Sequence, residues 1–295
     1  MSRGISSARV MSGFVMSGLF GAILASMIPA MPAAATEPVD LELVIATDVS
    51  RSIDEDEAQL QRRGIAAAFR SKVIIRAIQS GFLRRITVAY IDYSSALFNK
   101  VVVDWRILAD RNSAEAFADT LLRAPLTFGR RTSISDGIAL AARMIESNDI
   151  EGTRRVIDVS GDGPNNFGAL VNRVRDEAIA RRITINGLPI INKTDRFNSR
   201  YFLPDLDDYY RGCVIGGPGA FLVAARNFKD FARAIRRKLI LEIAGLTPKT
   251  RIADRGLLIR ASTHSPLRAR RSGYVYKKGC DIGECMRDGY WGDEP

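Results

Sequence analysis

Oxygen-bearing side chains recur in three short stretches that lie far apart in this chain of 295 residues. The first stretch holds Asp48, Ser50 and Ser52, the second holds Thr132, and the third holds Asp162. Carboxylate and hydroxyl oxygens are hard ligands, so they suit Mg²⁺, Mn²⁺ or Ca²⁺ far better than they suit zinc or copper. If folding brings the three stretches together, they can hold one hard divalent cation.

Each stretch also has an ordinary structural interpretation. Asp48 and Ser50 could cap the helix that follows them, Thr132 or Ser133 could cap another helix, and Asp162 begins a common Asp-Gly turn. Their order along the chain, with each stretch at a strand end or a helix start, favours one shared metal site over three separate coincidences.

The segments around these stretches predict alternating strands and helices. Short apolar runs predict strands over residues 41–47, 86–93, 100–105, 154–159, 183–191 and 220–224. Apolar residues at helical spacing predict helices over residues 55–80, 113–123, 135–146, 168–181 and 228–244. The connection at 94–99 is too short for a crossover helix, so the strand at 100–105 is expected to pair antiparallel with its predecessor.

This alternation predicts an α/β fold: a doubly wound, mostly parallel sheet with helices on both faces and one antiparallel edge strand. In such sheets, ligands bind beyond the carboxyl ends of the strands. The three oxygen-rich stretches fall at those ends. The fold class therefore supports their convergence.

The pattern Asp-x-Ser-x-Ser, with a later Thr and a later Asp-Gly, resembles the metal-ion-dependent adhesion site of von Willebrand factor A-type domains. The resemblance covers roughly residues 41–244 and includes the antiparallel hairpin. Two features depart from the family pattern. Arg130 and Arg131 stand where the family more often has small residues, and Ser160-Gly161 precedes the aspartate where a Thr is common.

The resemblance implies a role for each residue of the proposed site. Ser50 and Ser52 would bind the cation through their hydroxyls, and Thr132 would bind it when a partner is engaged. Asp48 and Asp162 would balance its charge, often through bound water. An aspartate or glutamate of a partner protein would complete the coordination, which implies a binding module and no enzyme.

Two alternatives to a binding module remain open at the level of the sequence. One is a metal-dependent phosphohydrolase that uses Asp48 as its nucleophile, although no second acid and no positioned lysine can be identified for it. The other is a structural α/β domain with a vestigial site. The single histidine, His264, lies outside the predicted core, and the phosphate-loop and dinucleotide motifs are absent from the sequence.

The N-terminal residues predict export. Arg3 and Arg9 precede a mostly apolar stretch at 10–28, and three alanines at 33–35 provide the small residues that signal peptidase requires. We expect a cleaved signal peptide over residues 1–35 and a secreted or periplasmic protein. A retained membrane anchor is the alternative, but Ser and Gly interrupt the apolar stretch, which ends at Pro29 and Pro32. No later segment is long and apolar enough to span a bilayer.

The mature chain is expected to contain a von Willebrand A-like domain over residues 36–245 and a basic, irregular tail over residues 246–295. The chain has a formal net charge of +10, but its basic residues are not interleaved with aromatics as a base-stacking surface requires. We therefore expect no nucleic-acid partner. Electrostatic contact with an anionic envelope surface is a use for this charge.

Three cysteines and one insertion complete the expectations. Cys280 and Cys285 could close a small loop in an oxidising compartment and leave Cys213 unpaired as a small buried side chain. The insertion at 192–212 is rich in aspartate and tyrosine. It is expected either to contact a partner or to pack against its own domain.

Overall fold

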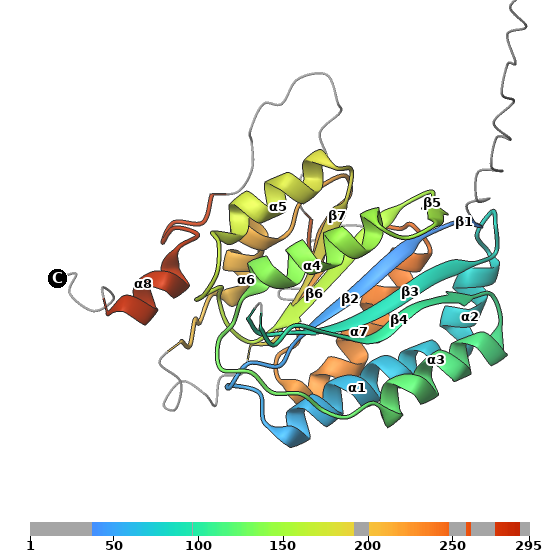
Figure 1. Cartoon of the computed structure of the whole chain (residues 1–295), viewed down its shortest axis with the longest axis horizontal. Coiled ribbons are helices and arrows are strands. Elements are labelled where there is room, and N and C mark those ends of the chain that lie inside the picture. The colour runs from blue at the N-terminus through green and yellow to red at the C-terminus, as the bar shows by residue number, and fades with distance from the viewer. Residues whose placement is uncertain (1–36, 96, 192–200, 248–257, 261–274, 290–295) are drawn as a thin grey trace, which may run out of the picture. The chain divides into compact units, whose positions relative to one another are not determined.

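The computed structural model describes residues 37–95, 97–191, 201–247, 258–260 and 275–289 (Figure 1). The predicted signal peptide, His264, the first part of the insertion and most of the tail lie outside these residues. The described helices include none that is long and apolar enough to cross a bilayer.

A seven-stranded sheet with the order β4-β3-β2-β6-β7-β8-β9 forms the centre of the described structure. Its strands are β2 (Glu42–Asp48), β3 (Ile86–Tyr93), β4 (Lys100–Leu108), β6 (Arg155–Gly161), β7 (Thr184–Pro189), β8 (Phe221–Val223) and β9 (Leu258–Arg260). Strands β3, β2, β6, β7 and β8 run parallel, and β4 pairs antiparallel as predicted. Strand β9 adds a second antiparallel edge. Strands β1 (Glu37–Val39) and β5 (Ile150–Gly152) form a separate parallel pair.

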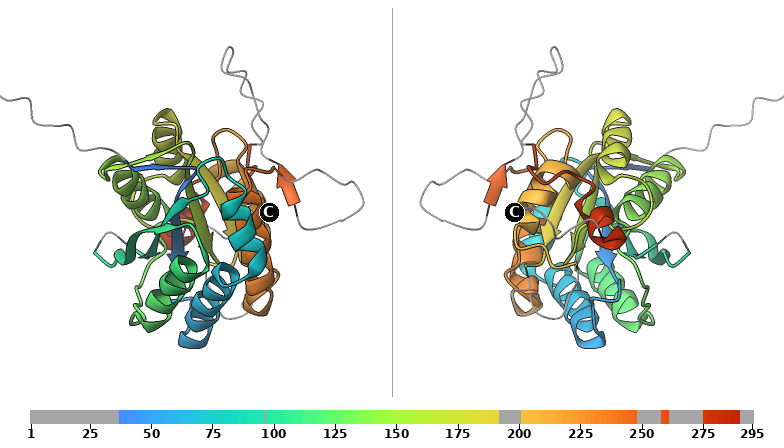
Figure 2. Two further views of the ribbon diagram at one scale, coloured as in Figure 1. Left: turned by 90° about the vertical axis from the view of Figure 1, so that its right-hand side faces the viewer. Right: turned by 90° about the vertical axis from the view of Figure 1, so that its left-hand side faces the viewer.

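Helices cover both faces of the sheet (Figures 1 and 2). One face is covered by α1 (Glu55–Phe69), α2 (Lys72–Gln79), α3 (Arg111–Arg123) and α7 (Phe228–Ile243). The other is covered by α4 (Ile134–Glu146), α5 (Val171–Ala180), α6 (Leu206–Tyr209), the π-helix η2 (Tyr210–Val214) and α8 (Ile282–Asp288). The predicted doubly wound α/β class is confirmed.

Strand β2 shows why the central strands read as continuous apolar runs. All of its residues are buried, because each face of the sheet lies under helices. Leu43 and Ile45 enter the core beneath α1 and α7, whereas Val44 and Ala46 enter the core beneath α4. Asp48 is the last residue of the strand, and the chain continues from there into α1.

The single helix predicted over 55–80 is wrong, since the chain forms α1 and α2 with a break between them. Ser71 adopts an extended conformation and its hydroxyl accepts a hydrogen bond from the Ile74 amide at 3.3 Å. Serine offers this alternative to a continuous helix because its short side chain can cap a new one. The break buries Ile74 and Ile78 and leaves Val73 exposed.

The described part of the insertion packs against its own domain. Leu203, Leu206, Tyr209 and Tyr210 are buried in the same core as α4 and α5. Of the two expectations for this segment, packing therefore applies to residues 201–212.

The described part of the C-terminal segment corrects two expectations. Residues 275–289 do not form an irregular extension, because Tyr276, Ile282 and Met286 are buried in the core. Cys280 pairs with Cys213, and Cys285 is free. The expected Cys280–Cys285 pairing is wrong because the segment before α8 packs directly on η2, as the tight contact between Gly212 and Tyr276 indicates.

Candidate metal site

Strand ends and helix starts bring the three oxygen-rich stretches to one edge of the sheet, at the left-hand end in Figure 1. Asp48 is the last residue of β2, and Asp162 directly follows β6. These strands pair in parallel up to Thr47 and Ser160, so the loops after them are neighbours. Thr132 lies two residues before the start of α4.

Hydrogen bonds join all five predicted site residues. The Thr132 hydroxyl donates to Ser50 Oγ at 3.0 Å, and Ser50 Oγ lies 3.2 Å from Ser52 Oγ. Ser52 Oγ donates to Asp162 Oδ1 at 2.8 Å. Asp48 Oδ1 accepts from the Ser50 amide at 2.8 Å. Ser52 and Asp162, which are 110 residues apart in sequence, thus belong to one continuous cluster of oxygen atoms.

The two carboxylates of the cluster lie where a bound cation would stabilise their charge. Asp48 is fully buried, and its Oδ2 has no hydrogen-bond partner. Burial raises the pKa of this carboxyl well above its usual value, and the nearby charge of Asp162 raises it further. A cation would relieve both penalties, so the donor set fits a hard divalent ion.

The capping alternatives account for few of these contacts. Asp54, not Asp48 or Ser50, caps α1, with its carboxylate accepting from the Glu57 amide. Ser133 caps α4 by accepting from the amide of the third helical residue. The hydroxyl of Thr132 is therefore left to the cluster.

Tyr93, Tyr210 and Gly161 lie next to Asp48, and the sequence patterns did not indicate the two tyrosines. A Cβ atom placed on Gly161 would lie 2.7 Å from the Tyr93 hydroxyl, 3.0 Å from the Tyr210 hydroxyl and 3.1 Å from Asp48 Oδ2. The missing side chain allows these groups to meet. Tyr210 comes from η2, so the insertion contributes directly to the surroundings of Asp48.

Asn165 and Asn166 are a second set of residues that sequence reasoning missed. Asn166 Oδ1 accepts from the Thr132 amide at 3.0 Å, and the Asn166 amide donates to the Thr132 carbonyl at 2.9 Å. Asn165 Oδ1 accepts from the Ser135 amide at 2.9 Å. The only available signal was two consecutive asparagines after Pro164, which reads as an ordinary turn.

The two arginines that precede Thr132 form no hydrogen bond or ion pair with the oxygen cluster in the described structure. Arg130 and Arg131 are exposed, and Arg131 donates to the Tyr201 hydroxyl at 3.2 Å. Lys238, a fully buried lysine of α7, pairs with Asp158 of β6 and with Glu242 of its own helix. Within the described ranges, no group of three or more His, Cys, Asp or Glu side chains could hold a metal ion, so a site here depends on hydroxyl donors.

Solved structures with similar folds include a pilus adhesin, SpaC from Lactobacillus rhamnosus GG. It has a TM-score of 0.50 and 14% sequence identity, with 72% of this chain and 31% of the adhesin covered. Proximal thread matrix protein 1 from the mussel byssus, solved with a zinc-occupied MIDAS motif, has a TM-score of 0.49 and 14% identity over 72% of this chain and 49% of its own. A von Willebrand factor type A protein from Catenulispora acidiphila has a TM-score of 0.47 and 16% identity over 70% and 43%.

The chain spans about half or less of the length of these solved proteins. Comparison with curated proteins gives no match. The profile of one sequence family matches residues 38–247, which include every strand and helix from β2 to α7. The chain therefore shares its fold with the pilus adhesin and belongs to the family described as protein of unknown function (DUF1194).

Proposed function

We propose that this protein is an exported, metal-dependent binding module of the adhesion type, which captures an acidic side chain of a partner protein. The observation that carries the proposal is the continuous oxygen cluster from Thr132 to Asp162, beside a buried Asp48 oxygen that lacks a partner. A cluster built mainly of neutral hydroxyls around two carboxylates suits Mg²⁺, with Mn²⁺ or Ca²⁺ as alternatives.

The residues of the cluster would divide the work between binding and charge balance. Ser50, Ser52 and Thr132 would supply hydroxyl ligands, and Asp48 and Asp162 would supply the negative charge that attracts the ion. A bound divalent ion supplies an electrophilic position that a carboxylate from a partner can fill. Because three of the five groups are neutral, the ion would keep enough charge to attract that carboxylate.

The similarity to the pilus adhesin supports a binding role, since that solved protein is an adhesin with the same fold. A shared fold does not identify a binding partner, so the partner is found by experiment. Turnover of a generic phosphate ester, lost in Asp48→Ala, would favour the phosphohydrolase alternative.

Export is the second part of the proposal, with a signal peptide at residues 1–35, a binding domain at 36–245 and a C-terminal extension at 246–295. The Cys213–Cys280 disulfide supports it, because disulfides persist in oxidising compartments. N-terminal sequencing of the protein recovered from the envelope or the medium should give a mature terminus near Thr36. A chain that keeps its first residues in the cytoplasm would contradict export.

Metal binding can be tested by thermal unfolding in Mg²⁺ or Mn²⁺. Saturating metal should raise the melting temperature of the wild-type protein, since a ligand at about a hundred times its Kd adds about 2.7 kcal/mol of stability. Asp48→Ala and Ser50→Ala should abolish the rise. Asp110→Ala is the control, because Asp110 caps α3 and is not one of the five residues of the oxygen cluster. This variant should lower the melting temperature without changing the metal-dependent rise.

A further inference from the structure

The loop that follows β6 is held from outside by the C-terminal helix. Glu284 Oε1 accepts from Asn165 Nδ2 at 2.7 Å, and Arg287 Nη1 donates to the Asn166 carbonyl at 3.2 Å. Gly283 allows this approach, because a Cβ at that position would lie 2.0 Å from the Asn165 carbonyl oxygen. Helix α8 therefore packs directly on the loop that begins with Asp162.

The same two asparagines connect the helix to the oxygen cluster. Asn166 exchanges two hydrogen bonds with the backbone of Thr132, and Asn165 accepts from the Ser135 amide in the first turn of α4. The positions of Asp162 and Thr132 relative to each other thus depend on a loop that contacts α8 through the Asn165 side chain and the Asn166 carbonyl.

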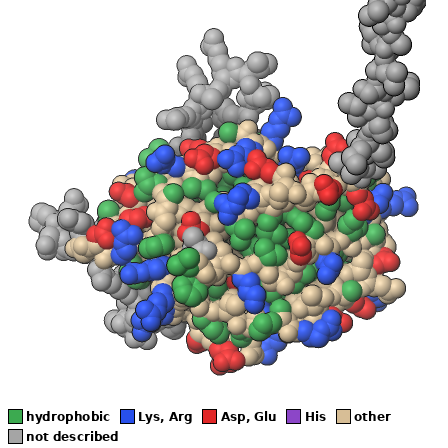
Figure 3. All heavy atoms as spheres, in the orientation of Figure 1, with side chains coloured by type: hydrophobic (Ala, Val, Ile, Leu, Met, Phe, Trp, Pro, Cys, Tyr) green, Lys and Arg blue, Asp and Glu red, His purple; other side chains and the backbone are tan. Residues whose placement is uncertain are grey.

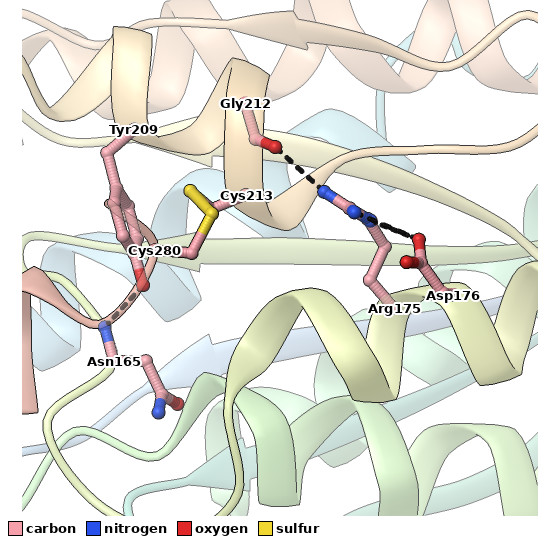
Figure 4. Close-up of a disulfide and its surroundings, with 7 residues drawn as sticks. All are labelled: Asn165, Arg175, Asp176, Tyr209, Gly212, Cys213 and Cys280. Atoms are coloured by element: carbon pink, nitrogen blue, oxygen red, sulfur yellow. Dashed lines mark hydrogen bonds and ion pairs between the residues drawn. A yellow bond between two sulfur atoms is a disulfide. The ribbon is translucent and has the colours of Figure 1, made fainter. Parts of the chain in front are cut away.

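A disulfide fixes the segment before α8 to η2, the helix that follows the insertion's first part (Figure 4). Cys213 and Cys280 are bonded to each other, and the Tyr276 ring packs edge-on against Tyr209 at a centroid distance of 5.6 Å. The Tyr209 hydroxyl accepts from the Asn165 amide at 3.1 Å. The disulfide, the insertion and the loop therefore form one connected unit.

We propose that residues 275–289 act as a C-terminal clasp that positions the metal-binding loops, with Glu284 as the positioning residue and the Cys213–Cys280 bond as its anchor. This inference rests on the proposed metal site. Groups that orient metal ligands from outside commonly change metal affinity, because an unrestrained loop must be ordered when the ion binds.

A purely structural role for the clasp is the competing explanation, since Ile282 and Met286 also bury apolar surface. The two explanations differ at Glu284, whose carboxylate contacts the loop. Asn165 Nδ2 donates to Glu284 at 2.7 Å and to the Phe167 and Ala169 carbonyls at 3.1 Å each. Glu284→Ala removes the shortest of these contacts, which is the one to α8, whereas Glu284→Gln keeps an oxygen that can accept the same hydrogen bond. Cys285→Ser alters the next residue of the same helix and is the matched control.

The decisive measurement is Mg²⁺ affinity by calorimetric titration of the mature protein with its disulfide intact. Glu284→Ala should weaken the affinity about tenfold, at the lower end of the usual effect of outer ligands. Glu284→Gln should restore most of it, and Cys285→Ser should leave it unchanged. An unchanged affinity in Glu284→Ala, together with a lower melting temperature, would overturn the positioning role.

Hydrogen exchange of the metal-free protein separates a failure of this inference from a failure of the metal site. Amides of residues 162–168 should exchange faster in Glu284→Ala than in wild type, and not in Cys285→Ser. If wild type shows this protection but binds no Mg²⁺, the proposed function fails and the clasp remains. If exchange is the same in all variants, the clasp inference is wrong even where Mg²⁺ binds.

Discussion

Gly161 shows how one residue without a side chain allows the groups of the candidate metal site to approach one another. Its Cα faces the hydroxyls of Tyr93 and Tyr210 and the unpaired oxygen of Asp48, all within 3.1 Å of the place that a Cβ would occupy. Gly163, only two residues away, has a single neighbour near that place, Thr132 Oγ1 at 3.9 Å. Replacing each glycine with alanine therefore adds the same methyl group at a crowded position and at an open one.

Gly161→Ala should destabilise the protein by about 1–3 kcal/mol, because the buried groups around it must move apart. It should also abolish the Mg²⁺-dependent rise in melting temperature, since Asp48 would be displaced. Gly163→Ala should retain that rise and nearly all of the stability. Equal behaviour of the two variants in urea unfolding and in Mg²⁺ titration would show that Gly161 is not part of the site.

At the scale of elements, α7 is joined to β6 and β7 by buried charges. Lys238 Nζ lies 2.5 Å from Asp158 Oδ1 and 2.5 Å from Glu242 Oε1, and Asn186 donates to Glu242 at 2.7 Å. Burial raises the pKa of Glu242 to about 8, and the charge of Asp158 raises it while Lys238 opposes the change. One lysine thus faces two carboxylates on the side of the sheet away from α4.

This arrangement predicts a pH dependence of stability. The folded-state pKa of Glu242 lies above its value in the unfolded chain, so the native protein holds this proton more tightly. The free energy of unfolding should therefore fall as pH rises from about 4.5 to about 8, with no further loss from this group above that range. Urea unfolding across this range should show a smaller fall in Glu242→Gln. An equal fall in both proteins would assign the effect to other groups.

At the scale of the whole molecule, the visible surface mixes charged and apolar side chains, and a disulfide links distant parts of the chain. Basic, acidic and apolar side chains are interspersed over the face seen in Figure 3, which suits a surface that meets proteins better than one that follows a polyanion. The Cys213–Cys280 bond joins residues 67 apart in sequence, from η2 to the segment before α8. It therefore connects the C-terminal extension to the domain.

Removing this cross-link should cost stability. The unfolded chain loses freedom when a long loop is closed, which for natural disulfides corresponds to about 2–4 kcal/mol. Replacing all three cysteines with serine should lower the free energy of urea unfolding by this amount relative to Cys285→Ser alone. A negligible difference would mean that packing of Tyr276, Ile282 and Met286 already holds the segment in place.

Much of the fold followed from local patterns. Strands that are buried on both faces are mostly apolar, so β2, β3 and β6 were recognisable from composition even though each also buries a carboxylate. The residues of the candidate site were recognisable because hard oxygen ligands leave a distinctive set of residue types at strand ends. Their spacing predicted the cluster that Asp48, Thr132 and Asp162 form in the structure.

Other features depended on tertiary contacts between distant segments. The partner of Cys280, the packing of α8 on Asn165 and the close approach of Tyr210 to Gly161 all join elements that no local pattern relates. Local sequence limits which backbone conformations and ligand types are available, because those depend on each residue and its near neighbours. Only the packed structure decides which side chains meet, since that depends on how the sheet, the insertion and the C-terminal helix fill space together.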